Sequence, residues 1–260
     1  TMVAGIIRRQ STLIHEANAL LGRVNGALAG RVTLIASAFP ELAGLPAALK
    51  GKVRFTGNPV RDQIRALRDV TYAAPTSGNE LRLLVFGGSQ GAKIFGEIVP
   101  NALGALPDAL KERINLVQQV RAEDLSQVQK ACAESGIKAE LKPFFSDMAE
   151  RLKAAHLVVG RAGASTVTEL AVIGRPSILV PLPSAMDDHQ TVNAQSLVAV
   201  GGAILLPQKE FTPQRLTEVI VGLMADSERL ARMAKAARAL GQADAQVLLA
   251  DLVEDLARDK

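Results

Sequence analysis

Three segments of the sequence place glycine, hydroxyl, amide or carboxylate groups directly after an apolar run. The first, FGGSQG, contains Gly87, Gly88 and Gly91, and Ser89 adds a hydroxyl donor. A glycine-rich turn between a strand and a helix exposes backbone N–H groups at the positive end of the helix dipole. Glycine also permits positive φ and a close approach to the backbone. This segment predicts a phosphate or diphosphate site; a tight turn without a ligand is the alternative.

The second segment, GRAGASTVTE, follows another apolar run and opens a helical pattern with small residues. We expect Ser165 or Thr166 to cap this helix and Glu169 to lie near its first turn. The carboxylate of Glu169 can accept two hydrogen bonds from neighbouring hydroxyls, such as those of a sugar ring. The alternative is that Glu169 is an acid that only complements the helix dipole.

The third segment, VPLPSAMDDHQTVNA, contains two prolines, two acids and two amides. Asp187 or Asp188 is a candidate helix cap. Gln190 and Asn193 lie three positions apart, so they share a helix face and offer amide groups to sugar hydroxyls. All three segments follow predicted strands, and ligands bind at the carboxyl edge of an open α/β sheet. Together they predict a ligand of the nucleotide-diphosphate type.

The elements that position these segments alternate along the chain. Apolar runs predict strands at 11–16, 32–38, 52–57, 81–87, 113–119, 156–160, 176–182 and 202–206. Periodic patterns predict helices at 91–106, 122–136, 164–174, 188–201, 212–226, 227–240 and 245–260. Strands that alternate with helices predict an α/β fold with parallel sheets joined by right-handed crossovers.

Composition limits the class of protein. Hydrophobic residues make up 48% and aromatic residues 3% of the 260 positions, which suits an aliphatic α/β core. The net charge of +4 favours an anionic ligand or surface and is too scattered to predict nucleic-acid binding. The single cysteine, Cys132, forms no internal disulfide and is expected to be an inert thiol on a helix. With three histidines, the sequence predicts no metal site.

Five motifs follow one another along the chain: LIHEANALLGRVN, TGNPVR, FGGSQGA, GRAGASTVTELAVIGRPSILVPLP and DDHQTVNA. With these motifs the sequence resembles the MurG family of bacterial N-acetylglucosaminyltransferases. The resemblance extends from about Leu13 to Leu252 in the order of the family. It implies a GT-B-type fold of two Rossmann-like domains. Residues 1–65 would then be the remnant of the acceptor-side domain, 66–80 a linker and 81–240 the donor-binding domain. A final helix at 241–260 would pack back toward the domain junction.

The resemblance also implies the activity and the partners. The family transfers N-acetylglucosamine, with inversion, from UDP-N-acetylglucosamine to an undecaprenyl-diphosphate-linked N-acetylmuramoyl-pentapeptide, converting lipid I to lipid II for peptidoglycan. It acts as a peripheral enzyme on the anionic cytoplasmic face of the plasma membrane and uses no cofactor. The polar terminal helix is expected to contribute little to membrane binding, because it carries more acids than bases.

Matching positions imply a set of donor contacts. Glu169 corresponds to the ribose ligand, Gln190 to a contact with sugar hydroxyls, and Phe145 to the position whose backbone meets the uracil. The family more often has an aliphatic residue at Phe145, and a glutamine where His189 stands. The implied substrate-binding residues are Asn18, Arg61, Ser89, Phe145, Ala164, Ser165, Thr166, Val167, Thr168, Glu169 and Gln190.

The catalytic base is unassigned, because the family begins with a strand and a loop of the form G-G-T-G-G-H that this sequence does not contain. We expect a longer protein that includes this loop; a non-catalytic donor-binding half that needs a partner chain is the alternative. Another UDP-sugar transferase or an epimerase of the same fold is a second alternative. His15 is more simply structural than catalytic, since its neighbour Glu16 points to the opposite face of a strand. His156, Arg161 and Arg175 are expected to be structural or exposed.

Overall fold

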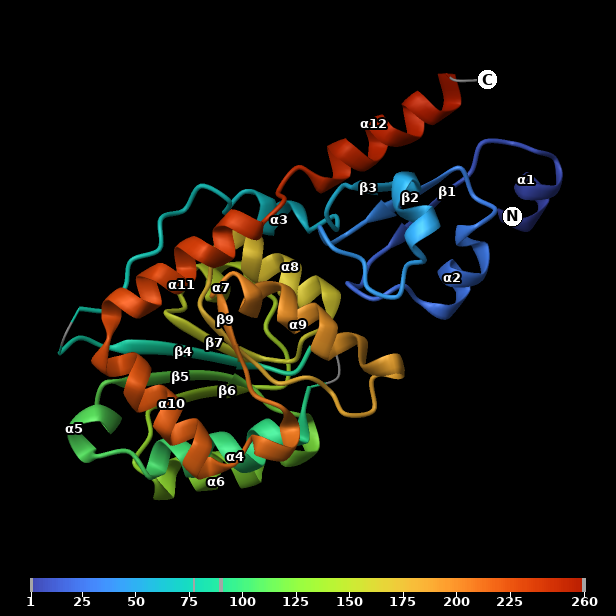
Figure 1. The fold of residues 1–260 in the computed structure, drawn as a ribbon. Helices are drawn as coiled ribbons and strands as arrows, with labels where there is room; N and C mark the ends of the chain where they lie inside the picture. The colour runs from blue at the N-terminus through green and yellow to red at the C-terminus, as the bar shows by residue number, and fades with distance from the viewer. Residues whose placement is uncertain (1, 77, 89–90, 259–260) are drawn as a thin grey trace.

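The structure is a computed structural model that describes residues 2–76, 78–88 and 91–258. It contains two parallel β-sheets with helices around them (Figure 1). The first sheet has the strand order β1-β2-β3, with β1 at Leu13–Glu16, β2 at Leu34–Ser37 and β3 at Val53–Phe55. We call residues 2–65, which include this sheet, the N-terminal unit.

The second sheet lies in residues 81–240, which we call the C-terminal unit. Its strand order is β6-β5-β4-β7-β8-β9, and every neighbouring pair is parallel. The strands are β4 (Leu81–Phe86), β5 (Ile114–Gln119), β6 (Ala139–Lys142), β7 (Leu157–Gly160), β8 (Ser177–Leu179) and β9 (Ala203–Leu205). The chain runs outward from β4 to β6 and then returns to β7 beside β4. This doubly wound order confirms the predicted α/β fold.

Helices connect the strands and complete the chain. They are α1 (Met2–Ile7), α2 (Arg23–Ala29), α3 (Asp62–Arg65), α4 (Lys93–Gly104), α5 (Asp108–Lys111), α6 (Leu125–Glu134), α7 (Met148–Ala154), α8 (Ala164–Ile173), α9 (His189–Ala199), α10 (Pro213–Ala225), α11 (Ser227–Leu240) and α12 (Ala245–Arg258). Thr212 caps α10 through its side chain, and Pro213 occupies the first helical position as predicted. In the described part of the chain, no helix has the length and apolar character needed to cross a membrane.

Helices cover both faces of the C-terminal sheet because its central strand is apolar on both sides. In β4, Leu83 and Val85 face a core formed with α4, α6 and α10. Leu84 and Phe86 face the opposite core, formed with α7, α8, α9 and α11. Figure 1 shows these two groups of helices on opposite sides of the sheet. The alternation fixes the sheet between two layers, so that only its edges and strand ends are open to a ligand.

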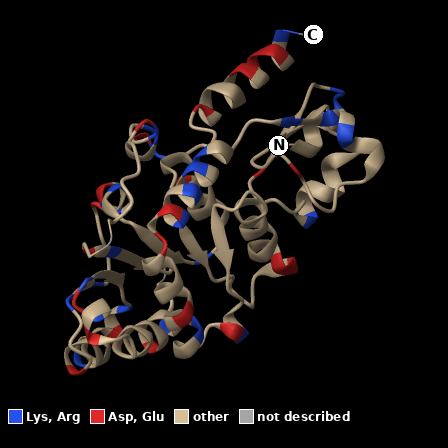
Figure 2. Ribbon diagram, turned by 60° about the vertical axis from the view of Figure 1, so that its left-hand side comes forward, with Lys and Arg blue, Asp and Glu red and all other residues tan. Residues whose placement is uncertain are grey.

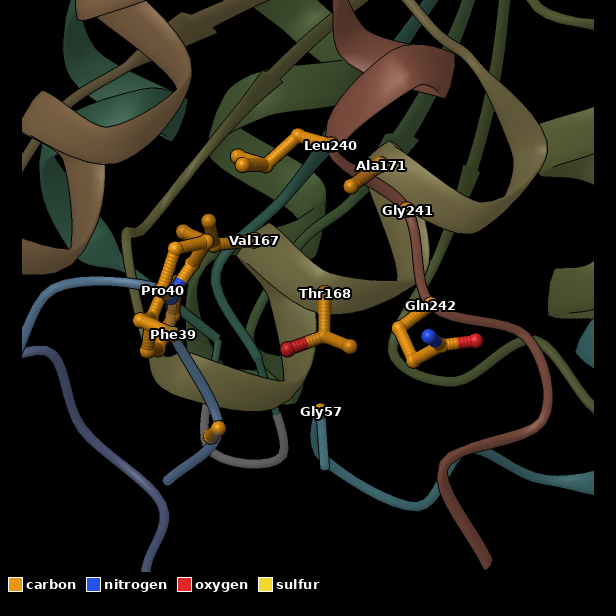
Figure 3. A pocket seen from close by; sticks show the side chains of 10 residues that line it. Phe39, Pro40, Gly57, Val167, Thr168, Ala171, Leu240, Gly241 and Gln242 are labelled. Carbon is orange, nitrogen blue, oxygen red and sulfur yellow. The ribbon is translucent and has the colours of Figure 1, made fainter. Parts of the chain in front are cut away.

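The two units meet at a tightly packed seam (Figure 3). Gly57, just after β3, approaches Gln242, in the segment that follows the C-terminal unit, so closely that a Cβ at position 57 would lie 2.8 Å from the Gln242 side chain. Phe39 and Val167 face the same small space, whose cavity of about 10 Å³ is no larger than one water molecule. The contact around Gly57 therefore has no room for a substrate, whereas a larger cavity of about 930 Å³ lies beside it and is lined by residues of both units.

Candidate functional site

The carboxyl ends of β4 and β7 meet at the point where the strand order reverses. Phe86, at the end of β4, pairs with Gly160, at the end of β7. The loops 87–92 and 161–163 therefore leave neighbouring strands at one edge and lead into α4 and α8 on opposite faces. Ligands of open α/β sheets bind at such a reversal. The fold thus brings the first two predicted segments together.

The glycines of the first loop have different local causes. A Cβ on Gly87 would lie 2.4 Å from the backbone nitrogen of Ala92, so the turn itself requires this glycine. Gly88 and Gly91 have φ angles of 83° and 69°, which favour glycine. A Cβ on Gly88 would meet no described atom within 4 Å, so this side of the loop is open. Ser89, the predicted diphosphate contact, lies outside the described residues.

Both helices at this edge begin without a side-chain cap. The capping positions are Ala92 for α4 and Gly163 for α8, and neither carries a side chain that could accept a hydrogen bond. The prediction that Ser165 or Thr166 caps α8 is wrong, because the helix already begins at Ala164. The first-turn N–H groups of each helix therefore lack a side-chain acceptor and carry the positive end of the dipole. Two such ends at one edge suit an anionic ligand with two phosphates.

Glu169 lies in the second turn of α8, where the helix dipole has little influence, so the dipole explanation for this acid is wrong. Its carboxylate pairs with Arg61 of the N-terminal unit through two hydrogen bonds of 3.0 Å each. The structure therefore joins two of the predicted donor contacts to each other. The side chains of Val167 and Thr168 are buried, and the Thr168 hydroxyl donates to the Ala164 carbonyl. These two residues therefore pack within the protein and offer no side chain to a ligand.

The side-chain amide of Gln190, at the start of α9, bonds the protein through its oxygen. Its Oε1 accepts from the backbone N–H groups of Ala162, at 3.2 Å, and Leu182, at 3.0 Å. Among the hydrogen bonds of the described residues, none gives its Nε2 an acceptor. Asn193 was predicted to offer its amide to a sugar, and this prediction is wrong, because the side chain is 0% exposed and bonds only to the protein.

The loop before α9 reaches the N-terminal unit. Asp187 and Arg23 of α2 form a two-point ion pair with distances of 2.6 and 2.9 Å. The hydrogen bond from Arg23 lowers the pKa of Asp187 below its usual value. Asp188 occupies the capping position of α9 but bonds the Thr191 hydroxyl instead of a backbone N–H. Asp187 and Asp188 both have φ of 53°, an unusual backbone for residues other than glycine.

The end of β1 contributes Asn18 from the N-terminal unit. Glu16 is 3% exposed and accepts hydrogen bonds from the backbone of Asn18 and Gly22 and from the Asn25 amide. His15 points the other way, with Nε2 3.2 Å from the Gly57 carbonyl. No bond joins His15 to Glu16 in the described hydrogen-bond network. The pair therefore lacks the geometry of a base and its orienting acid.

Phe145 follows β6 at the same edge of the sheet. Its ring is buried and lies under the Arg151 guanidinium, 4.8 Å from the ring centroid, so the ring packs within the protein and is not open to a base. Gln119 was not singled out in the sequence. Its Oε1 accepts from Gly87 N at 3.3 Å, and its Nε2 donates to the Pro143 carbonyl at 3.2 Å. This side chain links the glycine loop to the loop that carries Phe145. The sequence signal for its role was the polar pair Gln118 and Gln119 at the end of an otherwise apolar strand.

Three other residues are buried and are used by the protein itself or are inert. Arg161 donates to the Val180 and Pro181 carbonyls, and burial lowers its pKa. Arg175 is 1% exposed and donates to carbonyls that end α7 and α8, with its pKa lowered by burial to about 10. Burial also raises the pKa of the Cys132 thiol to about 11, so the thiol is inert at neutral pH.

Comparisons with known proteins identify the family. Residues 82–249 match the glycosyltransferase family 28 C-terminal domain. Over 92% of its length the chain is 52% identical to a Rhodospirillum centenum protein named UDP-N-acetylglucosamine–N-acetylmuramyl-(pentapeptide) pyrophosphoryl-undecaprenol N-acetylglucosamine transferase, and it spans 63% of that protein. A Mesorhizobium japonicum protein of the same name is 49% identical over 100% of the chain, which spans 68% of it.

The fold agrees with these relatives. The crystal structure of Acinetobacter baumannii MurG superposes with a TM-score of 0.82 and 32% identity, covering 97% of this chain and 70% of that one. The resemblance inferred from the motifs is therefore confirmed, together with the GT-B-type architecture. The chain spans about two thirds of the length of the relatives it matches. The chain belongs to the MurG family of glycosyltransferases, and residues 82–249 are its glycosyltransferase family 28 C-terminal domain.

Proposed function

We propose that the protein containing this chain transfers N-acetylglucosamine from UDP-N-acetylglucosamine to a lipid-linked N-acetylmuramoyl-pentapeptide, a step of peptidoglycan synthesis. One observation carries the proposal. Two helices begin without side-chain caps at the reversal of the C-terminal sheet, and one of them follows a glycine-rich loop. This is a diphosphate site in the position where an α/β sheet binds nucleotides. The names of the relatives supply the sugar and the acceptor.

The donor residues divide by chemistry. The diphosphate lies against the glycine loop that contains Gly88 and against the starts of α4 and α8, the second of which begins at Ala164, and Ser89 adds its hydroxyl. The ribose diol bonds the Glu169 carboxylate, and the uracil edge meets the Phe145 backbone. The sugar ring meets amide groups of the two units. The role of every implied contact rests on its place in the family pattern and on its position at this edge. In this proposal residues 81–240 are the donor-binding domain, and 1–65 belong to the acceptor-side domain.

The reaction is a displacement at the anomeric carbon. The acceptor hydroxyl oxygen forms a bond to C1 of N-acetylglucosamine while the bond from C1 to the UDP oxygen breaks, and the configuration inverts. The bonding electrons leave with UDP, whose diphosphate gains negative charge. The helix N-termini stabilise that charge with fixed N–H dipoles. The hydroxyl proton passes to a base that the described residues do not supply in a suitable geometry.

An anionic membrane surface is the proposed site of action, because charge is unevenly divided along the chain. Residues 1–65 contain nine Lys and Arg against three Asp and Glu, whereas the whole chain has a net charge of +4. Figure 2 shows Lys and Arg positions, in blue, along the ribbon of the N-terminal unit, and acidic positions, in red, on the helix that ends at the C-terminus. A basic unit is attracted to anionic lipid head groups. The proposed acceptor, a lipid diphosphate, lies in such a surface.

Titration calorimetry of the whole protein with UDP-N-acetylglucosamine, UDP and UDP-glucose tests the donor site. Binding of all three, with preference for N-acetylglucosamine, and transfer of labelled sugar to the lipid acceptor would support the proposal. Release of N-acetylmannosamine instead would favour an epimerase of the same fold. Nucleotide binding by this chain with transfer only after addition of a second chain would favour a donor-binding half. Absence of nucleotide binding by the whole protein would refute the proposal.

A further inference from the structure

A buried amide joins the two units beside the proposed donor site. Asn193 of α9 is 0% exposed. Its Oδ1 accepts from the backbone N–H of Ala19 at 2.8 Å, and its Nδ2 donates to Asn18 Oδ1 at 3.0 Å and to the Ala162 carbonyl at 3.2 Å. Both hydrogens of the amide are used, as is its oxygen. Asn193 therefore has no group left for a ligand, although it contacts loops from both units.

The bond from Asn193 fixes the orientation of Asn18. Because Asn18 Oδ1 accepts from Asn193, its Nδ2 turns to the opposite side, 3.5 Å from Glu16 Oε1. The Asn18 backbone is also held, since its N–H donates to Glu16 Oε1 at 3.1 Å. One Nδ2 hydrogen of Asn18 is directed at Glu16, so the second hydrogen, and not the carbonyl oxygen, is left for a ligand.

Gln190, one turn before Asn193 on α9, is oriented in the same sense. Its Oε1 accepts from Ala162 N and Leu182 N. Ala162 thus gives its N–H to Gln190 and its carbonyl to Asn193, so that α9 and the loop after β7 are locked together on both sides of one residue. As with Asn18, the oxygen of the Gln190 amide faces the protein. Only its Nε2 is available to a ligand.

We infer that Asn193 is a positioning residue. It orients neighbouring amide groups so that the sugar end of the UDP-sugar site offers N–H groups rather than oxygen atoms to the ligand. It engages the oxygen of Asn18, so that one Nδ2 hydrogen of Asn18 is left for a ligand, and it fixes α9, which carries Gln190 with its oxygen also engaged. The remaining amide N–H groups match acceptor atoms of a sugar, such as an acetamido carbonyl or a hydroxyl oxygen. This inference rests on the proposed function and adds the polarity of the sugar contacts and the residue that sets it.

The substitution Asn193→Asp in the whole protein tests the inference. It keeps an oxygen for Ala19 N–H but places its second oxygen against Asn18 Oδ1 and the Ala162 carbonyl. Asn18 must then turn its N–H inward and its oxygen outward. We expect KM for UDP-N-acetylglucosamine to rise about tenfold, while the Kd for UDP, which lacks the sugar, changes less than threefold. The matched control is Gln195→Glu, the same change at an exposed position of α9, and it should alter neither.

A second variant and a double-mutant cycle separate positioning from simple loss of stability. Asn18→Asp keeps the acceptor for Asn193 but removes the outward N–H, so it should raise the same KM without changing UDP binding. In an Asn18→Ala background, Asn193→Asp should lose most of its effect on KM, because both changes act through one contact. Additive effects, or equal weakening of UDP and UDP-N-acetylglucosamine, would overturn the inference.

Failure of the proposed function gives a different result. If the wild-type protein binds no UDP-sugar, the function fails, and the contact between the units is still measurable by amide hydrogen exchange. Ala19 N–H should exchange slowly in the wild type and in Gln195→Glu, and much faster in Asn193→Leu, because Oδ1 of Asn193 is its acceptor. Unchanged protection of Ala19 in Asn193→Leu would show that the amide does not join the units, and would overturn the inference whatever the substrate is.

Discussion

Replacing Glu169 by glutamine tests whether its carboxylate serves a nucleotide or only its partner in the N-terminal unit. Glu169 and Arg61 form two hydrogen bonds of 3.0 Å each. The side chain of Glu169 is 12% exposed and that of Arg61 is 55% exposed. Because the guanidinium is more than half exposed, the pair stabilises the fold by about 0.5 kcal/mol, up to 1. A hydrogen bond to a charged group contributes about 1.5–3 kcal/mol when water is excluded from it. A ribose contact is therefore worth more than the pair.

The expected outcome of Glu169→Gln follows from this difference. The melting temperature should fall by only about 1–4 °C, while the affinity for UDP and for UDP-N-acetylglucosamine should fall equally, by about 10- to 100-fold. The two ligands share the ribose, so both should respond. Calorimetric titration and thermal unfolding of the same preparations give the two quantities.

Asp187→Asn is the matched control, because Asp187 also forms a two-point ion pair between the units, with Arg23. It changes a carboxylate to an amide in the same way but lies outside the implied ribose contact. It should lower the melting temperature by a similar small amount and leave the affinity for UDP within twofold. If Glu169→Gln behaved like this control, Glu169 would be a residue of the contact between the units, and the ribose assignment would be refuted.

Three further predictions concern pH, packing and metal dependence. Burial, with Arg82 nearby, lowers the pKa of His156 to about 4. The free energy of unfolding should therefore be full above pH 6.5 and lower by about 2 kcal/mol at pH 5. Urea unfolding measures this loss, which should be smaller in His156→Phe. Gly57→Ala should lower the free energy of unfolding by about 1–3 kcal/mol, because the φ angle at Gly57 is 81° and the Gln242 side chain is in contact. Gly51 faces open space, so Gly51→Ala should lower it by less than about 1 kcal/mol. Transfer should persist in a chelator, because helix N-termini can stabilise the leaving diphosphate; strict Mg²⁺ dependence would contradict this.

The sequence predicted the fold through hydrophobic patterning and glycine placement. Eight of the strands were located, since their apolar runs are bounded by glycine, proline or charge. β6 was not predicted, because AELK has only two apolar residues and is an edge strand that needs one buried face. The site loops were located because parallel strands bring their carboxyl ends to one edge. The rest of the site depends on contacts between distant residues, which no local pattern contains.

The contacts between the units are the clearest example of that limit. Asn193 and Gln190 have the same amide chemistry and lie one helical turn apart, so no local pattern distinguishes their roles. Burial separates them, since Asn193 is 0% exposed and bonds residues 31 and 174 positions away. Satisfied buried amides hold a single geometry, because each lost bond leaves an unpaired group away from water. The exposed pair of Arg23 and Asp187 is screened by salt and free to reform. The geometry at the sugar end is therefore set by the uncharged contact, and raising ionic strength should weaken the ion pairs while leaving the orientation of the amides unchanged.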